Sequence, residues 1–221
     1  MAYIDFLSPL HSVTKRDYLA RVNEFPKAEA ARLAKNYGYD YWDGDRKTGY
    51  GGYKYIDGYW KRIAEPLIKH YDLQPGDKVL DIGCGKGFLL YDMLKVLSSL
   101  KVKGIDISEY AIEHAKPEIK PYLEIGNAVD LPYEDNSFDF VISLTTIHNL
   151  HCFDMLKALK EIERVGKKHK YFVVESYRNL EEKTNMTYWV LTGECFFCDE
   201  EWDWWIKKAG YSGDHSFIYF E

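Results

Sequence analysis

Acidic side chains stand at the ends of two successive apolar runs of the sequence, together with closely spaced glycines. The first run, in KVLDIGCGKG at residues 78–87, ends at Asp81 and leads into Gly83, Gly85 and Gly87. The second run, KGIDIS, ends at Asp106. A tight turn with alternating glycines lets the backbone approach a ligand because no Cβ intervenes. The pattern predicts a ligand-binding loop in which Asp81 holds a cationic amino group.

The glycine spacing distinguishes two classes of cofactor, the dinucleotides and S-adenosylmethionine. A dinucleotide loop requires G-x-G-x-x-G, whose third glycine would fall at position 88. That position holds Phe88, and the third glycine is Gly87. The observed D-x-G-x-G-x-G therefore disfavours NAD. Asp106 can accept hydrogen bonds from both hydroxyls of a ribose, but NAD enzymes share this feature, so it does not decide alone.

A third apolar run leads into GNAVDLPYEDNSFDFVIS at residues 126–143. Within it, Asn127 can hydrogen-bond the edge of an adenine, because an amide offers both donors and an acceptor. Ala128 and Val129 can add a backbone N–H and an apolar wall. This segment is the more discriminating one, and it predicts an adenine site next to the ribose site.

The elements that must position these residues alternate between strand and helix. Strand-like runs alternate with helical periodicity from residue 78 to the end of the chain, which predicts a mostly parallel sheet covered on both faces. In such sheets, ligands bind at the carboxyl ends of the strands. Before this core, residues 16–35 are expected to form a helix that Pro26 kinks or splits, and residues 59–71 a further helix.

At this point the sequence resembles the class I S-adenosylmethionine-dependent methyltransferases that act on small molecules. VLDIGCGKG is similar to their first motif, GIDIS to their second, and NAVDLPYEDNSFDFVIS to their adenine segment and fourth strand. TTIHNL is similar to the segment after that strand, where many members carry a histidine. The resemblance covers about residues 65–175. It implies an α/β fold with a Rossmann-like sheet of six to seven strands, and S-adenosyl-L-methionine as the cofactor.

The resemblance also implies a role for each matching residue. The methionine moiety would be lined by Asp81 and the three glycines, the ribose bound by Asp106, the adenine bound by Asn127 and Ala128, and the sulfonium approached by the backbone of Leu144. The full set of expected cofactor contacts is Asp81, Gly83, Cys84, Gly85, Gly87, Asp106, Ile107, Asn127, Ala128, Val129 and Leu144.

The sequence departs from the family pattern in two places. The family usually has aspartate where this chain has Asn127. The family's sheet usually ends in an antiparallel hairpin, whereas only about ten residues follow KKAGYSG here. We therefore expect the seventh strand to be absent, or to be supplied by YWVLTGECFF.

Methyl transfer to a hydroxyl needs a general base, whereas an amine needs only to arrive neutral. His148 follows the fourth predicted strand and is the best candidate base. The alternative is a histidine that packs at a strand end with one hydrogen bond. Glu175 ends the fifth predicted strand and is the second catalytic candidate, although it could instead pair with Arg178.

Residues 36–60 contain seven tyrosines and six glycines, and a Rossmann-like sheet does not require such a segment. It is expected to be a lid whose rings exclude water and attract the sulfonium. The alternative is an aromatic flap that covers a sheet edge. Tyr50, Tyr53 and Tyr55 are its expected ligand contacts, and Trp204 is expected to wall the acceptor pocket. Acidic residues at 40, 43 and 45 favour a cationic or hydroxylated acceptor, or form a solvated loop.

CFFC at residues 195–198 lacks a second ligand pair, so buried cysteines are expected there and no metal site. The four cysteines form no disulfide framework, which favours the cytoplasm. The net charge of -6 argues against a nucleic-acid partner, and no apolar run is long enough for a membrane span.

We therefore expect one domain over residues 1–221, with an N-terminal helix and lid at 1–60 and a core at 61–221. Its expected activity is methyl transfer from S-adenosylmethionine to a small-molecule hydroxyl or amine. A protein side-chain methyltransferase, a non-catalytic cofactor-binding module and an NAD oxidoreductase are the alternatives. The acceptor, the choice between O- and N-methylation, the number of methyl groups and the oligomeric state stay open.

Overall fold

The structure is a computed structural model, and it describes residues 1–11 and 16–221. Within these residues one six-stranded sheet has the order β3-β2-β1-β4-β5-β6, and all of its pairings are parallel. The expected Rossmann-like α/β fold is confirmed. The strands are β1 Lys78–Ile82, β2 Lys101–Asp106, β3 Leu123–Ile125, β4 Phe138–Leu144, β5 Gly166–Glu175 and β6 Asp214–Ile218.

The described residues contain no seventh strand. The segment YWVLTGECFF ends a helix at Trp189 and then continues as a loop. Of the two alternatives for the seventh strand, its absence is the one observed.

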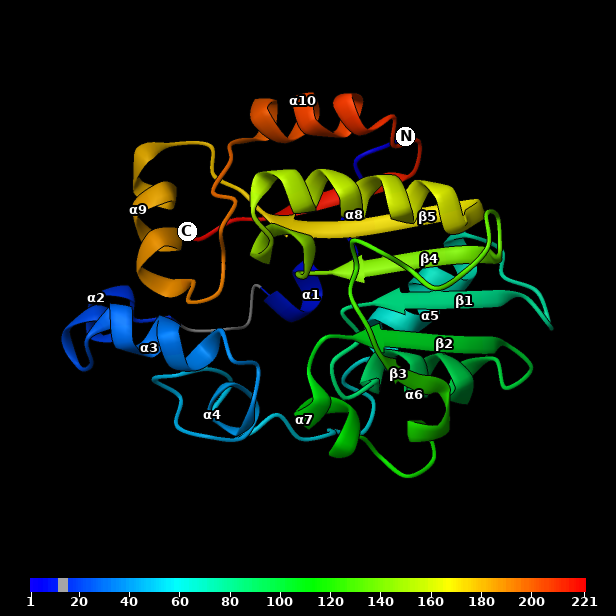
Figure 1. Cartoon of the computed structure of the whole chain (residues 1–221), viewed down its shortest axis with the longest axis horizontal. Helices are drawn as coiled ribbons and strands as arrows, with labels where there is room; N and C mark the ends of the chain where they lie inside the picture. Colours follow the sequence, from blue (N-terminus) through cyan, green and yellow to red (C-terminus); the bar gives the residue numbers. More distant parts are fainter. Residues whose placement is uncertain (12–15) are drawn as a thin grey trace.

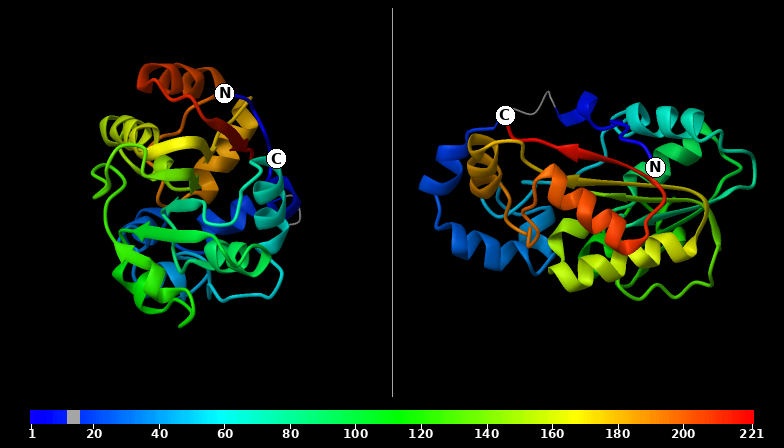
Figure 2. Two further views of the ribbon diagram at one scale, coloured as in Figure 1. Left: turned by 90° about the vertical axis from the view of Figure 1, so that its right-hand side faces the viewer. Right: turned by 90° about the horizontal axis from the view of Figure 1, so that it is seen from above.

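Helices cover both faces of the sheet. The face formed by Val79, Phe140 and Val173 packs against α5 Lys61–His70 and α6 Phe88–Val96, and the short α1 Ser8–His11 adds to the same cluster. The opposite face packs against α8 Cys152–Val165 and α10 Asp199–Ala209. Figure 2 shows these two layers of helices on either side of the sheet. Continuous apolar strands are what a sheet buried on both faces requires.

The remaining helices gather around the carboxyl ends of the strands. They are α2 Tyr18–Asn23, α3 Lys27–Ala34, α4 Tyr39–Trp42, α7 Glu109–Glu113 and α9 Leu180–Trp189, with a 3₁₀ turn at Ile147–Asn149. A second 3₁₀ turn, Lys120–Tyr122, leads into the start of β3. The strand arrowheads in Figure 1 point toward the side where α2, α3, α4 and α9 lie. The expected split at Pro26 is confirmed, because Pro26 is the N-cap of α3 and separates it from α2.

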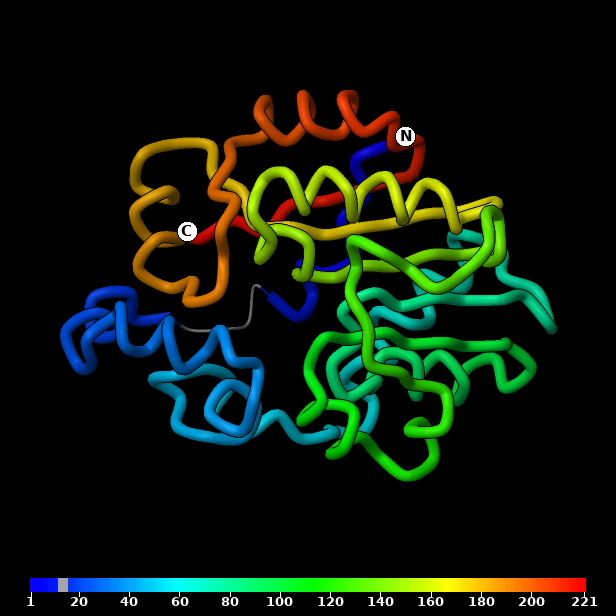
Figure 3. Tube along the Cα trace, viewed as in Figure 1, coloured from blue at the N-terminus to red at the C-terminus, as the bar shows by residue number. Residues whose placement is uncertain are grey.

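The N-terminus is joined to the last strand. Tyr3 forms a parallel bridge with His215, and the backbone N–H of Ile4 donates to the carbonyl of His215 (2.9 Å). Figure 3 shows the chain starting beside β6 and later passing to the carboxyl ends of the strands. None of the helices in the described residues has the length and apolar character needed to cross a bilayer.

Candidate active site

The loop between β1 and α6 is built from left-handed glycines. Gly83, Gly85 and Gly87 have φ values of 76°, 54° and 70°. A Cβ on Gly83 would lie 2.0 Å from Oγ1 of Thr146, and one on Gly85 would lie 2.7 Å from the ring of Trp42. Only glycine fits these positions, because L-residues avoid this backbone region and no space is left for a side chain.

Two cavities lie at the carboxyl ends of the strands. The larger has a volume of about 580 Å³ and is lined by Asp81 and the first turn of the glycine loop, with His148 and Glu175 on its far wall. The smaller has a volume of about 170 Å³ and is lined by residues that follow β2 and β3. The two cavities share a wall, formed by Tyr41, Trp42, Tyr50, Gly83, Leu144, Thr145 and Asn149.

Most of the residues expected to contact the cofactor line these cavities. Asp81, Gly83, Cys84, Gly85 and Leu144 line the larger one, and Asp106, Ile107, Asn127 and Ala128 line the smaller one together with Gly83 and Leu144. Gly87 and Val129 do not line either cavity. Gly87 instead begins α6 as its N-cap.

The two carboxylates of the site are held differently. Asp106 accepts hydrogen bonds from the backbone N–H groups of Gly85 (2.7 Å) and Ser108 (2.8 Å), which fix its orientation. Burial still raises its pKa, against the effect of these bonds. Asp81 is 4% exposed and accepts no side-chain hydrogen bond from the described residues. Burial, followed by the charge of Asp106, raises the pKa of Asp81 to about 7. A cationic donor would supply what Asp81 lacks.

The side chain of Asn127 forms a hydrogen bond with the backbone of its own loop. Its Oδ1 accepts a hydrogen bond from the N–H of Val129 (3.2 Å), which is the pattern of an Asx-turn. The amide oxygen thus fixes the loop after β3, and the amide nitrogen keeps its donors for a ligand. Aspartate, the usual residue at this position, has no such donor when ionised.

His148 and Glu175 form a buried pair in the larger cavity. Nε2 of His148 lies 3.3 Å from Oε2 of Glu175, and Nδ1 of His148 has no hydrogen-bond partner among residues 1–11 and 16–221. Burial lowers the pKa of His148 to about 3. Burial also raises the pKa of Glu175 to about 8, although the charges of Arg16 and Lys27 oppose this rise. At neutral pH the pair therefore holds a neutral imidazole and a protonated carboxyl.

The segment expected to be a lid packs onto the glycine loop. Nζ of Lys86 donates to both oxygens of Asp43 (2.7 and 2.8 Å) and to the carbonyl of Tyr53 (2.9 Å). The hydroxyl of Tyr110 donates to the same carboxylate (2.9 Å). Burial alone would raise the pKa of Asp43, but these bonds lower it overall. Lys86 thus fastens residues 43–53 to the loop, and we call this contact the Lys86–Asp43 latch.

Trp42 is a buried residue of the segment expected to be a lid. It is 6% exposed, and its indole N–H donates to the hydroxyl of Ser108 (2.9 Å) and to the carbonyl of Tyr37 (3.0 Å). Its ring stacks on Tyr50 with centroids 5.4 Å apart. Since Trp42 lines both cavities, it forms the roof where they meet.

Two of the predicted acceptor contacts lie elsewhere. Tyr50 and Tyr53 line the larger cavity, but Tyr55 does not, because its hydroxyl donates to Asp92 (2.6 Å) on α6. Trp204 is 56% exposed on α10 and packs against Trp205. The tryptophan that walls the cavity from this half of the chain is Trp189, at the end of α9.

The two cysteines of CFFC serve different contacts. The thiol of Cys195 is buried, with its Sγ 3.1 Å from the carbonyl oxygen of Leu150 and 4.0 Å from the Sγ of Cys152. Cys198 is the N-cap of α10. Packing thus explains Cys195, and helix capping explains Cys198.

Sequence reasoning missed the basic residues of the site. Arg16, Arg21 and Arg46 all line the larger cavity. In the sequence, the first two look like the solvent-facing positions of a helix, and the third lies in a polar loop. No local pattern marks them, since their position depends on how the N-terminal segment folds over the sheet.

A family model described as a methyltransferase domain matches residues 73–210. The demethylmenaquinone methyltransferase of Symbiobacterium thermophilum is 33% identical over 168 residues, which cover 69% of this chain and 62% of that protein. The 27-O-demethylrifamycin SV methyltransferase of Amycolatopsis mediterranei is 31% identical over 138 residues, which cover 59% of this chain and 47% of that protein. The chain thus spans only part of the length of these curated relatives.

Solved structures agree on the fold. A chain from the complex of the Haloferax volcanii Trm112 methyltransferase activator with a putative methyltransferase matches with a TM-score of 0.57 at 20% identity, covering 89% of this chain and 77% of that one. A putative methyltransferase of Bacillus halodurans matches with a TM-score of 0.55 at 20% identity, covering 66% of this chain and 68% of that one.

Proposed function

The chain belongs to the methyltransferase-domain family, and we propose that it transfers a methyl group from S-adenosylmethionine to a hydroxyl or amine of a small molecule. The observation that carries the proposal is that the two cavities are adjacent and share lining residues. Asp106 and Asn127, the residues expected to bind ribose and adenine, line the smaller cavity. His148 and Glu175 line the larger cavity, and Gly83 of the glycine loop lines both. The names of the two relatives, which refer to demethylmenaquinone and demethylrifamycin, support a small-molecule acceptor.

The residues present fit the proposed cofactor. Asp81 is a buried carboxylate to which no described side chain donates, so an amino-acid ammonium group could be its partner. Asp106 is oriented by two backbone N–H groups and keeps lone pairs for ribose hydroxyls. Ile107 and Ala128 give the smaller cavity apolar walls for a purine. When bound, S-adenosylmethionine supplies an activated methyl group at its sulfonium.

The chain's own residues would position the acceptor and manage its proton. Holding two reactants in line is worth several kcal/mol of the barrier. His148 is neutral near pH 7 and has an unpartnered Nδ1, so it can accept a proton from a hydroxyl. The ring proton then sits on Nε2, which lies 3.3 Å from Oε2 of Glu175 and donates to that carboxyl oxygen, so Nδ1 takes the hydroxyl proton. The imidazolium that forms carries one positive charge beside Glu175.

The proposal treats residues 1–221 as one domain, in which residues 1–60 form a lid over the core at 61–221. Leu7 and Leu10 are part of the same apolar cluster as the core strands. The Lys86–Asp43 latch then closes the aromatic segment over the glycine loop. Closure of this kind excludes water from the reacting groups.

The test is a methyl-transfer assay with a panel of hydroxyl and amine acceptors, using wild type, His148→Gln and the control His151→Gln. His151 is 77% exposed at its side chain and lies outside both cavities. We expect His148→Gln to lower the rate with a hydroxyl acceptor by about 10²-fold or more without weakening cofactor binding, and the control to match wild type. An unchanged rate in His148→Gln would remove the base assignment, and failure to bind S-adenosylmethionine would remove the proposal.

A further inference from the structure

Three guanidinium groups surround one indole at one end of the larger cavity. The guanidinium carbons of Arg16, Arg21 and Arg46 lie 5.6, 4.9 and 5.1 Å from the ring centroid of Trp189. All four residues line the larger cavity and none lines the smaller one. We call this group the arginine cluster. Stacking on an aromatic face holds guanidinium planes in place while leaving their N–H groups available.

No carboxylate in the described residues lies within ion-pair distance of the arginine cluster. The contacts that the guanidiniums do make are to neutral groups. Arg16 donates to the ring of His11 (2.8 Å to Nε2), Arg21 donates to the carbonyl of Arg46, and Arg46 donates to the carbonyl of Gly49 (2.7 Å). Nε of Arg16 and Nε of Arg21 are buried, and no described residue offers either of them a hydrogen bond. The four undescribed residues, Ser12 to Lys15, include no acid.

Repulsion among the three guanidinium groups and their burial both destabilise their positive charges. Burial lowers the pKa of each of the three side chains, and for Arg21 burial and the charge of Arg46 lower it to about 10. Glu175 is the acid whose charge acts on Arg16, but its own pKa of about 8 keeps it protonated near neutral pH. The end of the cavity therefore stays positive. Arg16 and Arg21 are half-buried and Arg46 is exposed. Half-buried cations without a counter-charge are costly unless an anion binds them.

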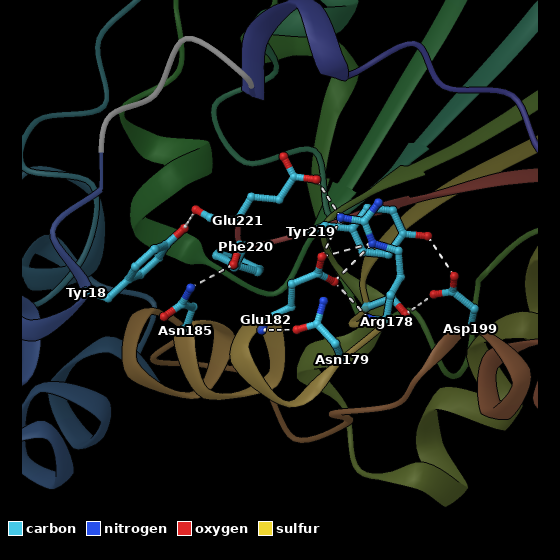
Figure 4. A network of polar contacts seen from close by, with 10 residues as sticks. Tyr18, Arg178, Asn179, Glu182, Asn185, Asp199, Tyr219, Phe220 and Glu221 are labelled. Carbon is cyan, nitrogen blue, oxygen red and sulfur yellow. Dashed lines mark hydrogen bonds and ion pairs between the residues drawn. The ribbon is translucent and has the colours of Figure 1, made fainter.

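The cluster is built on a fixed platform rather than on a free surface. Asn179 caps α9 through the N–H of Glu182 (2.9 Å), and Asn185 donates to the carbonyl of Phe220 (3.0 Å). The hydroxyl of Tyr18 on α2 donates to the carbonyl of Glu221 (3.0 Å). Figure 4 shows these contacts joining α9 and α2 through the C-terminal residues. They hold Arg21, on α2, against Trp189, on α9.

We infer that the methyl acceptor carries an oxyanion, a carboxylate or a phosphate, which the arginine cluster binds while its apolar body lies along the aromatic wall of the cavity. The inference rests on the proposed function and names the acceptor class for it. Trp60, Leu10 and Ile218 supply apolar lining next to the cluster. Arginine is suited to this role because its fork of donors matches the geometry of carboxylate and phosphate.

The acidic residues of the lid, which favoured a cationic acceptor from sequence, do not lie in the cavity. Asp43 is neutralised by Lys86 and Tyr110 in the latch, and Asp40 and Asp45 line neither cavity. Apart from Asp81, the acidic and basic side chains that line the larger cavity are those of the arginine cluster, His11, Lys54 and the His148–Glu175 pair.

The test measures anion binding to protein that is saturated with S-adenosylhomocysteine. Tryptophan fluorescence is the readout, because Trp189 lies within the arginine cluster. The probes are benzoate, phenyl phosphate and the neutral benzamide. The variants are Arg21→Gln and Arg46→Gln, with Arg32→Gln as the control, since Arg32 is exposed on α3, where it pairs with Glu29. Circular dichroism checks the fold of each variant.

We expect at least one anion to bind wild type and the control more tightly than benzamide, and each cluster variant to weaken it about tenfold or more. Which anion binds tighter tells carboxylate from phosphate. Equal binding of anions and benzamide would overturn the inference. So would loss of S-adenosylhomocysteine binding in the cluster variants, because the cluster would then hold the cofactor's own carboxylate. Failure of wild type to bind S-adenosylhomocysteine would instead overturn the proposed function.

Discussion

Glu175→Gln should change how the stability of the protein depends on pH. The pKa of Glu175 is 4.5 as an unperturbed group and about 8 in the folded chain, because burial disfavours its charge. Between these values the unfolded chain has lost a proton that the folded chain keeps. Wild type therefore loses about 1.4 kcal/mol of stability for each pH unit of rise. From pH 6.5 to pH 8 the loss attributable to this group is about 2 kcal/mol.

The window is chosen so that the partner of Glu175 contributes little. His148 has a lowered pKa of about 3, so the folded imidazole is neutral throughout the window. The unfolded imidazole, with an ordinary pKa of 6.5, loses its remaining half proton there in wild type and in Glu175→Gln alike. Glutamine has no proton to lose, so Glu175→Gln should gain about 2 kcal/mol over wild type across the window.

The assay is urea unfolding at pH 6.5, 7.2 and 8.0, with Glu181→Gln as the control because Glu181 is exposed on the neighbouring helix α9. The control should follow wild type at every pH. Parallel pH dependence of wild type and Glu175→Gln would refute the reasoning. It would mean that Glu175 is already ionised at pH 6.5 and forms an ion pair with a protonated His148.

Two further substitutions test the loop and the lid. Gly83→Ala should lower the free energy of unfolding by about 2 kcal/mol more than Gly76→Ala, as measured by urea unfolding. Both glycines have positive φ, but a Cβ at position 76 would meet open space, whereas a Cβ at position 83 would lie 2.0 Å from a side chain. Equal losses would show that the loop can relax. Lys86→Met leaves Asp43 without its cation and should cost about 3 kcal/mol and speed proteolysis within residues 36–60. Lys95→Met, at an exposed ion pair, should cost much less stability. Similar losses in the two lysine variants would count against the latch.

The cofactor side of the site follows from local sequence, because each feature is a property of a strand end. Gly83 and Gly85 indicate a left-handed backbone, because glycine favours that conformation. Asp106 indicates the end of β2, because an acidic residue follows a buried apolar run. Pro26 likewise marks a helix boundary by its missing N–H. These features need no knowledge of the rest of the chain.

The acceptor side does not follow from local sequence. Helix α9, LEEKTNMTYW, has no regular apolar stripe and buries only Glu182 and Met186, so its periodicity gives no signal. Its role depends on the cap at Asn179 and on contacts with the C-terminal residues. Without α9 in place, nothing singles out Trp189 over Trp204 as the wall of the cavity.

The central claim is that S-adenosylmethionine binds across the two cavities, and calorimetry tests it most directly. S-adenosylmethionine and NAD are titrated into wild type, Asp106→Ala and the control Asp130→Ala, whose parent residue is exposed and lines neither cavity. The account predicts binding of S-adenosylmethionine alone, weakened about tenfold or more in Asp106→Ala and unchanged in the control. Binding of NAD in its place, or equal affinity for S-adenosylmethionine in Asp106→Ala and wild type, would contradict it.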